Sequence, residues 1–207
     1  MARKLYPIGI QTFERIRKED MFYVDKTEYI YQMTHTDGTY FFLSRPRRFG
    51  KSLLVSTFKS YFEGKKELFK GLAIDKLEKE WKQYPVFHLS FGGQNFVEPY
   101  ALDKALEEFV AMAERIYGRE ELAETLGSRF KAVLGNAHKK TGMRAVVLID
   151  EYDKPLLDVM DMDISVQNEY GKMTLEDYNR NLLKGVYSVF KEADADLQFV
   201  LLTGVTK

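Results

Sequence analysis

The eight residues Arg-Pro-Arg-Arg-Phe-Gly-Lys-Ser, at positions 45–52, carry most of the information about the fold of this chain. They follow an apolar run, residues 40–43, and lead into a segment with a helical apolar pattern, residues 52–62. A turn between a strand and a helix can hold phosphates, because backbone N–H groups surround them, a lysine reaches the terminal phosphates and a Ser/Thr hydroxyl binds Mg²⁺. The stretch therefore predicts a phosphate-binding loop whose contacts come from Arg47, Arg48, Phe49, Gly50, Lys51 and Ser52.

The match to the usual phosphate-loop pattern is incomplete at its first position. That pattern has a glycine five residues before Gly50, and this chain has Arg45 there. We expect the loop to make its initial turn without the φ > 0 freedom that glycine supplies. A Gly-Lys-Ser triplet alone also fits an ordinary basic turn before a helix, so the assignment depends on the rest of the chain.

A second signal is the apolar run at residues 145–149, which ends in Asp150 and Glu151. Such a run is typical of a strand buried on both faces, and the carboxyl ends of parallel strands face the ligand. We expect Asp150 and Ser52 to hold Mg²⁺ and Glu151 to polarise the attacking water. Taken singly, the two acids also fit a helix cap or a solvated loop.

A third apolar run, residues 198–202, ends in Thr203. Its hydroxyl is expected at the same edge of the sheet, where it could sense the γ-phosphate. Because all three polar signals follow predicted strands, the sequence predicts one crevice at the carboxyl ends of those strands.

The alternation of strands with helices predicts an α/β fold with three layers, α/β/α, and a mostly parallel sheet. Residues 1–39 are expected to pack on the core as an N-terminal segment, and residues 40–207 to form the core itself. A further strand is predicted at 85–91. Helices are predicted at 99–117, 120–139 and 174–192, short amphipathic helices at 65–84, and a solvated loop over much of 154–173.

Composition excludes several classes of function. The chain has 207 residues with 31 basic and 31 acidic side chains, so no overall charge demands a nucleic acid partner. The absence of cysteine rules out disulfides, thiolate zinc sites and a thiol nucleophile. No signal peptide or apolar run of membrane-spanning length is present, so we expect a cytoplasmic protein without membrane contact.

Several motifs resemble those of the predicted AAA-ATPase-like proteins of bacteria and archaea, relatives of the archaeal-type and STAND-like phosphate-loop ATPases. The likeness spans nearly the whole chain, and it makes Arg45 a family trait of the Walker A loop. The motifs are Pro7-Ile8-Gly9, Tyr23-Val24-Asp25-Lys26-Thr27, residues 43–52, Tyr84-Pro85-Val86, the Walker B segment Asp150-Glu151-Tyr152-Asp153-Lys154-Pro155, and Leu202-Thr203-Gly204-Val205.

The resemblance implies an additional-strand ATPase core with strand order 5-1-4-3-2, in which the strand ending in Thr203 lies between the loop strand and the acid-pair strand. It also implies ATP as the nucleotide. Members commonly continue into a lid region and a C-terminal domain similar to PD-(D/E)xK nucleases, so the fifth strand and a nucleic acid partner would belong to parts beyond this chain. An apolar edge at residues 40–44 would then favour self-association.

The function expected from these signals is ATP binding with slow Mg²⁺-dependent hydrolysis that acts as a conformational switch. One alternative is a regulatory or nucleic-acid-associated module with little turnover, in which Arg45, Arg47 and Arg48 contact a nucleic acid backbone. Another is a kinase-like phosphotransferase, against which the acid pair favours activation of water.

Overall fold

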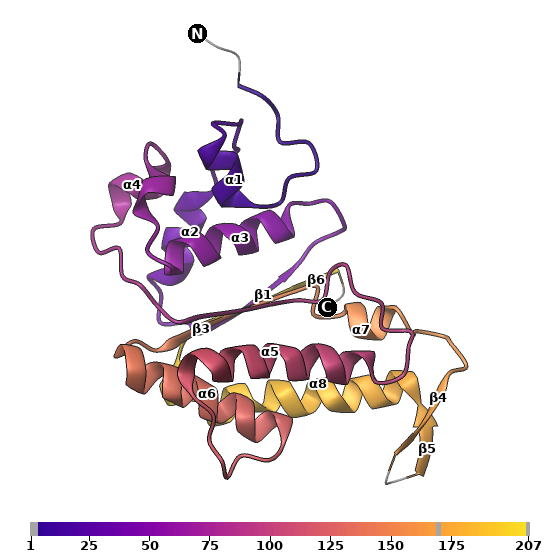
Figure 1. Ribbon diagram of the computed structural model, residues 1–207. Helices are drawn as coiled ribbons and strands as arrows, with labels where there is room; N and C mark the ends of the chain where they lie inside the picture. Colours follow the sequence, from indigo (N-terminus) through magenta and orange to yellow (C-terminus); the bar gives the residue numbers. More distant parts are fainter. Residues whose placement is uncertain (1–3, 169–170, 206–207) are drawn as a thin grey trace.

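A parallel sheet of four strands lies between two layers of helices in the computed structural model, which describes residues 4–168 and 171–205 (Figure 1). The order in the sheet is β1-β6-β3-β2. Thus β6, which carries Thr203, lies between the strand before the phosphate loop and the strand before the acid pair. The four strands are β1 (Tyr40–Ser44), β2 (Val86–Ser90), β3 (Ala145–Asp150) and β6 (Leu197–Gly204).

The position of the central strand β3 in the sheet explains its apolar composition. Every one of its residues is buried, because β2 and β6 flank it and helices cover both of its faces. A strand in that position needs an unbroken apolar run. The edge strand β1 differs, since Tyr40 and Phe42 are each 49% exposed.

The upper layer in Figure 1 contains the N-terminal segment and the helix that follows the phosphate loop. Phe13 of the segment contacts two elements of this layer: its amide donates a 2.9 Å hydrogen bond to Ser56 Oγ on that helix, and its ring lies 4.9 Å from that of Phe69 in the short helix that follows. The elements of this layer are α1 (Phe13–Lys18), α2 (Thr27–Thr34), α3 (Lys51–Phe62), the 3₁₀ helix η1 (Lys66–Phe69) and α4 (Ala73–Leu77).

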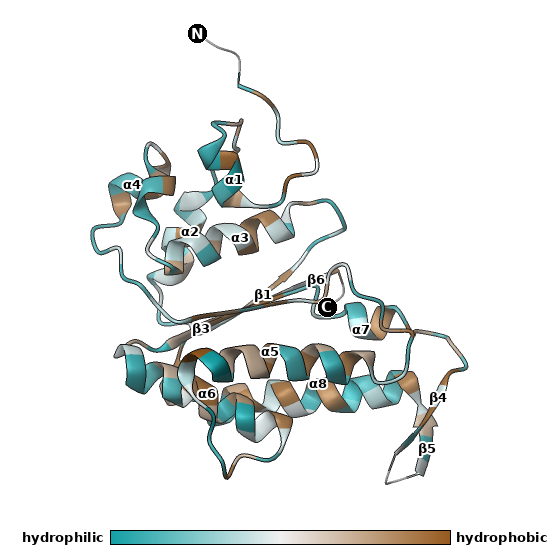
Figure 2. Ribbon diagram, in the orientation of Figure 1, coloured by the Kyte–Doolittle hydropathy of each residue, from teal (hydrophilic) through white to brown (hydrophobic). Residues whose placement is uncertain are grey.

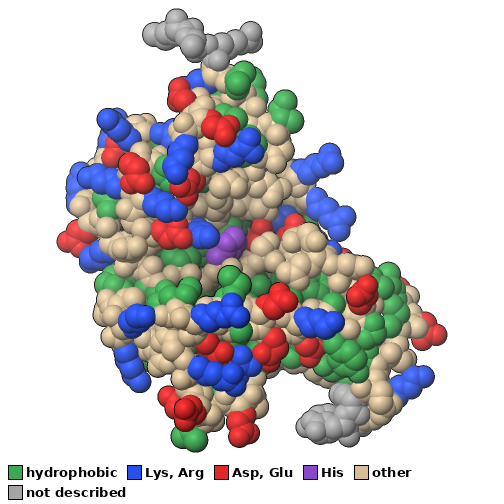
Figure 3. All heavy atoms as spheres, viewed as in Figure 1, with side chains coloured by type: hydrophobic (Ala, Val, Ile, Leu, Met, Phe, Trp, Pro, Cys, Tyr) green, Lys and Arg blue, Asp and Glu red, His purple; other side chains and the backbone are tan. Residues whose placement is uncertain are grey.

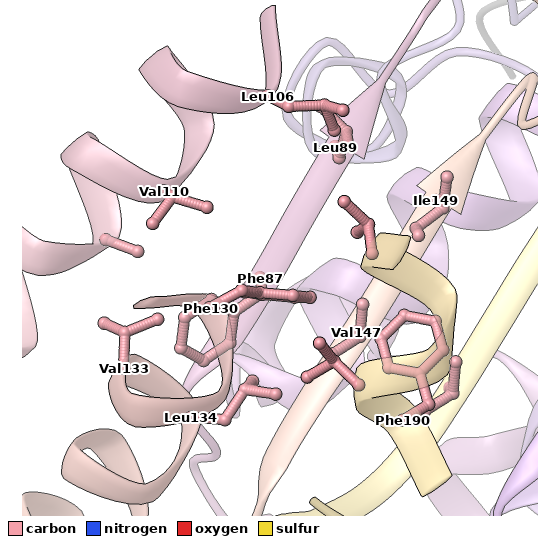
Figure 4. Packing of buried hydrophobic residues seen from close by; sticks show 14 of the residues in the cluster. Phe87, Leu89, Leu106, Val110, Phe130, Val133, Leu134, Val147, Ile149 and Phe190 are labelled. Atoms are coloured by element: carbon pink, nitrogen blue, oxygen red, sulfur yellow. The ribbon is translucent and has the colours of Figure 1, made fainter. Parts of the chain in front are cut away.

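Three longer helices form the lower layer: α5 (Ala101–Tyr117), α6 (Leu126–Thr141) and α8 (Leu175–Glu192). Hydrophobic and hydrophilic residues alternate along them in Figure 2, as expected for helices with one face on a sheet. Their apolar faces meet β2 and β3 in the packing shown in Figure 4, which includes Phe87, Phe130, Val147, Ile149 and Phe190. The described helices include none that is both long enough and apolar enough to cross a bilayer.

Two sequence predictions need correction. The helix predicted from residue 120 begins at Leu126, because Thr125 caps it: Thr125 Oγ1 accepts from the Ser128 amide (3.1 Å) while Ser128 Oγ accepts from the Thr125 amide (3.0 Å). This reciprocal capping box fixes the start of the helix.

The second correction concerns residues 154–173, which were predicted as a solvated loop. They contain α7 (Lys154–Leu157) and an antiparallel hairpin of β4 (Ser165–Asn168) and β5 (Gly171–Thr174). A small apolar cluster of Val159, Val166 and Leu175 holds the hairpin against α8. Each of these elements has only four residues, which is too short for a hydrophobic periodicity to be recognised in the sequence. The remaining described element is the 3₁₀ helix η2 (Asp194–Asp196).

Candidate functional site

The predicted phosphate loop runs from the end of β1 to the start of α3 and closes around Lys51. The side chain of Lys51 is only 7% exposed, and its ammonium group donates to the carbonyl oxygens of Arg45 (2.8 Å) and Pro46 (3.0 Å). The loop thus directs a positive charge inward at the N-terminus of a helix, where unpaired N–H groups already favour anions.

The backbone of this loop accounts for the arginine where a glycine is usual. The left-handed conformation occurs at Arg48 (φ 67°) and Gly50 (φ 74°), and Arg45 is not among the described residues with positive φ. Instead, the Arg45 amide donates to the Gly204 carbonyl (3.2 Å), which extends the pairing of β1 with β6. The initial turn therefore needs no glycine, and the conformation that L-residues disfavour falls on Arg48.

Ser52 and Asp150 line one polar cavity of about 290 Å³, between α3 and the end of β2. Asp150 is 4% exposed, and its Oδ1 accepts a hydrogen bond from Thr203 Oγ1 at 2.5 Å. A hydroxyl and a carboxylate are hard oxygen donors of the kind that Mg²⁺ prefers. Within residues 4–168 and 171–205, no three His, Cys, Asp or Glu side chains form a group that could hold a metal ion.

Thr203 is completely buried, and its hydroxyl is directed at Asp150. The sequence suggested that this hydroxyl could sense a γ-phosphate. In this arrangement it acts on the predicted metal ligand, because it fixes the orientation of one carboxylate oxygen.

Glu151 has a left-handed backbone (φ 55°) and reaches toward the end of β2. A methyl group built on Gly92 would lie 3.4 Å from Glu151 Oε2 and 3.3 Å from Ser90 Oγ. The two acids of the pair therefore diverge: Asp150 faces Thr203 on β6, and Glu151 lies beside the turn that follows β2.

His88 alternates with apolar neighbours in the sequence, a pattern typical of a histidine in the core or at its edge. The structure places it half-buried on β2, in the lining of the polar cavity. Burial, together with the nearby charge of Lys59, lowers the pKa of His88 and favours the neutral imidazole. The alternation of His88 with apolar neighbours gave no sign of the cavity.

From the sequence, Asp153 was recognised only as part of the motif at residues 150–155. It is 4% exposed, and its Oδ2 accepts a 2.8 Å hydrogen bond from the Val205 amide, just after β6. An acid three residues after Asp150 was the available signal, but only the fold shows that it reaches the neighbouring strand.

A second and larger cavity, of about 890 Å³, adjoins the phosphate loop on its other side. Arg48, Phe49 and Lys51 form one wall, and the N-terminal segment forms the opposite wall with residues such as Tyr23 and Tyr29. Phe49 is 64% exposed at the rim. The N-terminal segment thus shapes a pocket beside the loop.

Arg47 is exposed, and no described hydrogen bond or ion pair of its side chain identifies a role. On the face that Figure 3 shows, basic and acidic side chains are intermixed over the helices. This mixture agrees with the equal numbers of the two charges in the sequence.

Two comparisons with known proteins found similar sequences. A family model described as "Predicted AAA-ATPase" matches residues 7–207. A protein of Azotobacter chroococcum mcd 1, described as an "uncharacterized protein in vnfD 5'region", is 38% identical over 211 residues; the match takes in 100% of this chain and 38% of that protein. No solved structure gives a significant match. With nearly its entire length matched by the family model, the chain belongs to the predicted AAA-ATPase family.

Proposed function

We propose that this protein binds ATP and hydrolyses it slowly with Mg²⁺, and that the bound state acts as a conformational switch. The main observation in support is that two consecutive residues, Lys51 and Ser52, line two different cavities. Lys51 lines the large apolar cavity, and Ser52 lines the polar cavity that also contains Asp150. A nucleoside triphosphate needs the same sequence of environments: an apolar site for its base, a loop for its phosphates and a metal site beyond them.

In this proposal, Lys51 and the backbone of residues 47–52 hold the phosphates, and Arg47 or Arg48 adds positive charge beside them. Ser52 and Asp150 hold Mg²⁺, which neutralises phosphate charge when bound. Thr203 keeps Asp150 oriented through its hydrogen bond. Glu151 is the base that accepts a proton from the attacking water.

The apolar cavity is the proposed site of the nucleobase. Aromatic and aliphatic side chains suit the faces of a purine ring, and the cavity joins the phosphate loop at Gly50 and Lys51. The preference for ATP over GTP rests on membership of the family.

A titration with ATP and GTP, each with and without Mg²⁺, tests nucleotide binding. We expect Lys51→Ala to weaken ATP binding about tenfold or more, because a charge-assisted contact with phosphate is lost. Lys131→Ala, which breaks only a surface ion pair with Glu192, is the matched control. Unchanged ATP affinity in Lys51→Ala would refute the phosphate-loop assignment.

The base site has its own test. Leu54→Trp adds bulk to the lining of the apolar cavity, so it should weaken ATP binding but leave inorganic tripolyphosphate binding unchanged. Leu122→Trp, at a site 90% exposed and outside that lining, is the control. Equal effects of Leu54→Trp on ATP and tripolyphosphate would place the base elsewhere.

A second candidate is a regulatory module that binds nucleotide and scarcely hydrolyses it. The position of Glu151 beside Ser90 and Gly92, with no described hydrogen bond to Asp150 or Thr203, favours it. Glu151→Gln separates the two candidates. Under the proposed function it keeps ATP affinity and slows hydrolysis, whereas turnover that is equally low in both proteins supports the regulatory module.

A further inference from the structure

The segment that follows Thr203 is bonded to the phosphate loop on one side. The Arg45 amide donates to the carbonyl of Gly204 (3.2 Å), and Ser44 Oγ donates to the carbonyl of Val205 (3.3 Å). Any displacement of the end of β6 must therefore also move the first residues of the loop.

The same segment is bonded to the acid-pair turn on its other side. The Tyr152 amide donates to the carbonyl of Thr203 (2.9 Å), and the Val205 amide donates to Asp153 Oδ2 (2.8 Å). Tyr152 and Asp153, which follow Glu151, are thus bonded to Thr203 in β6 and to Val205 just after it. Of these two hydrogen bonds, the one to Asp153 is made by a side chain and the other by backbone groups alone. The proposed chemistry gives the Asp153 carboxylate no other role.

The contact between the two segments is close enough to require glycine at position 204. A methyl group there would lie 2.4 Å from Cε1 of Tyr152 and 2.8 Å from Oδ1 of Asp153. Such distances are well inside van der Waals contact, so a side chain at 204 would force the acid-pair turn away from β6.

Glu151 is the residue that depends on this attachment. Its left-handed backbone (φ 55°) is unfavourable for a residue with a Cβ and persists only where the surroundings hold it. On one side, the carbonyl of Asp150 accepts from the Phe91 amide (3.1 Å). On the other side, Tyr152 and Asp153 are fixed to β6.

We propose that Asp153 is a positioning residue for the nucleotide site. Its carboxylate anchors the end of β6 to the acid-pair turn, and so keeps Glu151 in its left-handed conformation and Thr203 within reach of Asp150. This inference rests on the proposed ATP hydrolysis, in which Glu151 is the base. Asp153 itself contacts neither nucleotide nor metal in this scheme.

The test compares Asp153→Ala with Asp153→Asn, because the asparagine carbonyl can still accept from the Val205 amide. We expect Asp153→Ala to lower kcat about 10- to 100-fold, since small displacements of reacting groups have effects of that size. ATP affinity should change by less than about threefold, because Lys51 and the loop backbone remain. Asp153→Asn should recover most of the lost kcat.

A second variant is needed because removal of a buried carboxylate can also lower kcat by unfolding the protein. Val205→Pro removes the donating amide and leaves Asp153 in place, and it should show the same fall in kcat at nearly constant ATP affinity. Val133→Ala, a buried site on α6 far from the strand ends, serves as a destabilised control with unchanged kcat. If Asp153→Ala and Val205→Pro both keep the kcat of Val133→Ala, the positioning role is refuted.

Amide hydrogen exchange separates failure of this inference from failure of the proposed function. If the wild-type protein shows no turnover, the proposed function fails, and exchange then decides the role of Asp153. Loss of protection at Tyr152 and Phe91 in Asp153→Ala or Val205→Pro supports the anchoring of the acid-pair turn. In Asp153→Ala, loss of protection confined to Val205 overturns it; in Val205→Pro, which has no amide at position 205, unchanged protection at Tyr152 and Phe91 overturns it.

Discussion

The hydroxyl of Thr203 donates a hydrogen bond to the carboxylate of Asp150, with 2.5 Å between Oγ1 and Oδ1. The two residues lie at the carboxyl ends of adjacent parallel strands, β6 and β3, and both are buried. A hydrogen bond of this kind fixes the orientation of the carboxylate, which a metal ligand requires.

Thr203→Val tests this relationship. The valine side chain has nearly the shape of threonine but cannot donate, so we expect the Mg²⁺ concentration needed for half-maximal ATP binding to rise about tenfold. Thr141→Val, at the exposed end of α6, is the matched control because the described hydrogen bonds of its hydroxyl join only backbone groups of Ala137 and Met143. The measurement is ATP binding at a fixed ATP concentration over a series of Mg²⁺ concentrations. An unchanged Mg²⁺ concentration for half-maximal binding in Thr203→Val would show that this hydrogen bond does not contribute to Mg²⁺ binding.

Arg45→Gly tests the unusual first position of the loop. Arg45 does not occupy the left-handed region, so glycine relieves no strain and only increases the freedom of the unfolded chain. We expect unfolding free energy to fall by about 0.5–1 kcal/mol and ATP affinity to stay equal or decrease. Denaturant unfolding and nucleotide titration measure both, and tighter ATP binding would contradict this account.

Acid should weaken the packing of α5 against α6 through Glu114. Arg129 donates two 2.9 Å hydrogen bonds to the Glu114 carboxylate, and these bonds hold the pKa of Glu114 below its usual 4.5. Because the unfolded chain binds this proton more readily, the contribution is present above about pH 4.5 and is lost as pH falls below that value.

Urea unfolding at a series of pH values between about 6 and 3 measures this effect. Glu114→Gln should be less stable than the wild type at the upper end of the series, and the difference should shrink toward the lower end. The control is Glu120→Gln, at an exposed position. A stability difference for Glu114→Gln that does not change with pH would exclude the proposed linkage.

The edge strand β1 should promote self-association of this chain. Tyr40 and Phe42 are each 49% exposed on a strand that pairs with β6 on one side and has no neighbour on its outer edge in the described sheet, and such edges pair with other chains. We expect Phe42→Lys to shift the sedimentation profile toward monomer, and Leu122→Lys, at an exposed loop position, to leave it unchanged. A wild-type chain that is already monomeric at high concentration would contradict this prediction.

The sequence by itself determined the elements whose signals are local. The apolar run 145–149 predicted a fully buried strand, since a strand with neighbours on both edges and helices on both faces is apolar along most of its length, and here only its last residue, Asp150, is polar. The helix beginning after Thr174 was confirmed for a similar reason: the threonine hydroxyl accepts from the Asp177 amide at 3.1 Å, a contact within one turn. Membership of the family was also predicted from motifs and is confirmed by the match over residues 7–207.

Only the tertiary structure decided how the candidate site residues relate to one another. Thr203 and Asp150 are 53 positions apart, and their hydrogen bond exists because β6 inserts between β1 and β3. The divergence of Glu151 toward β2, the attachment of Asp153 to Val205, and the apolar cavity beside the loop depend on the same arrangement. Local patterns report on neighbours along the chain, whereas these contacts are created by the order of the strands and by the packing of the N-terminal segment on α3.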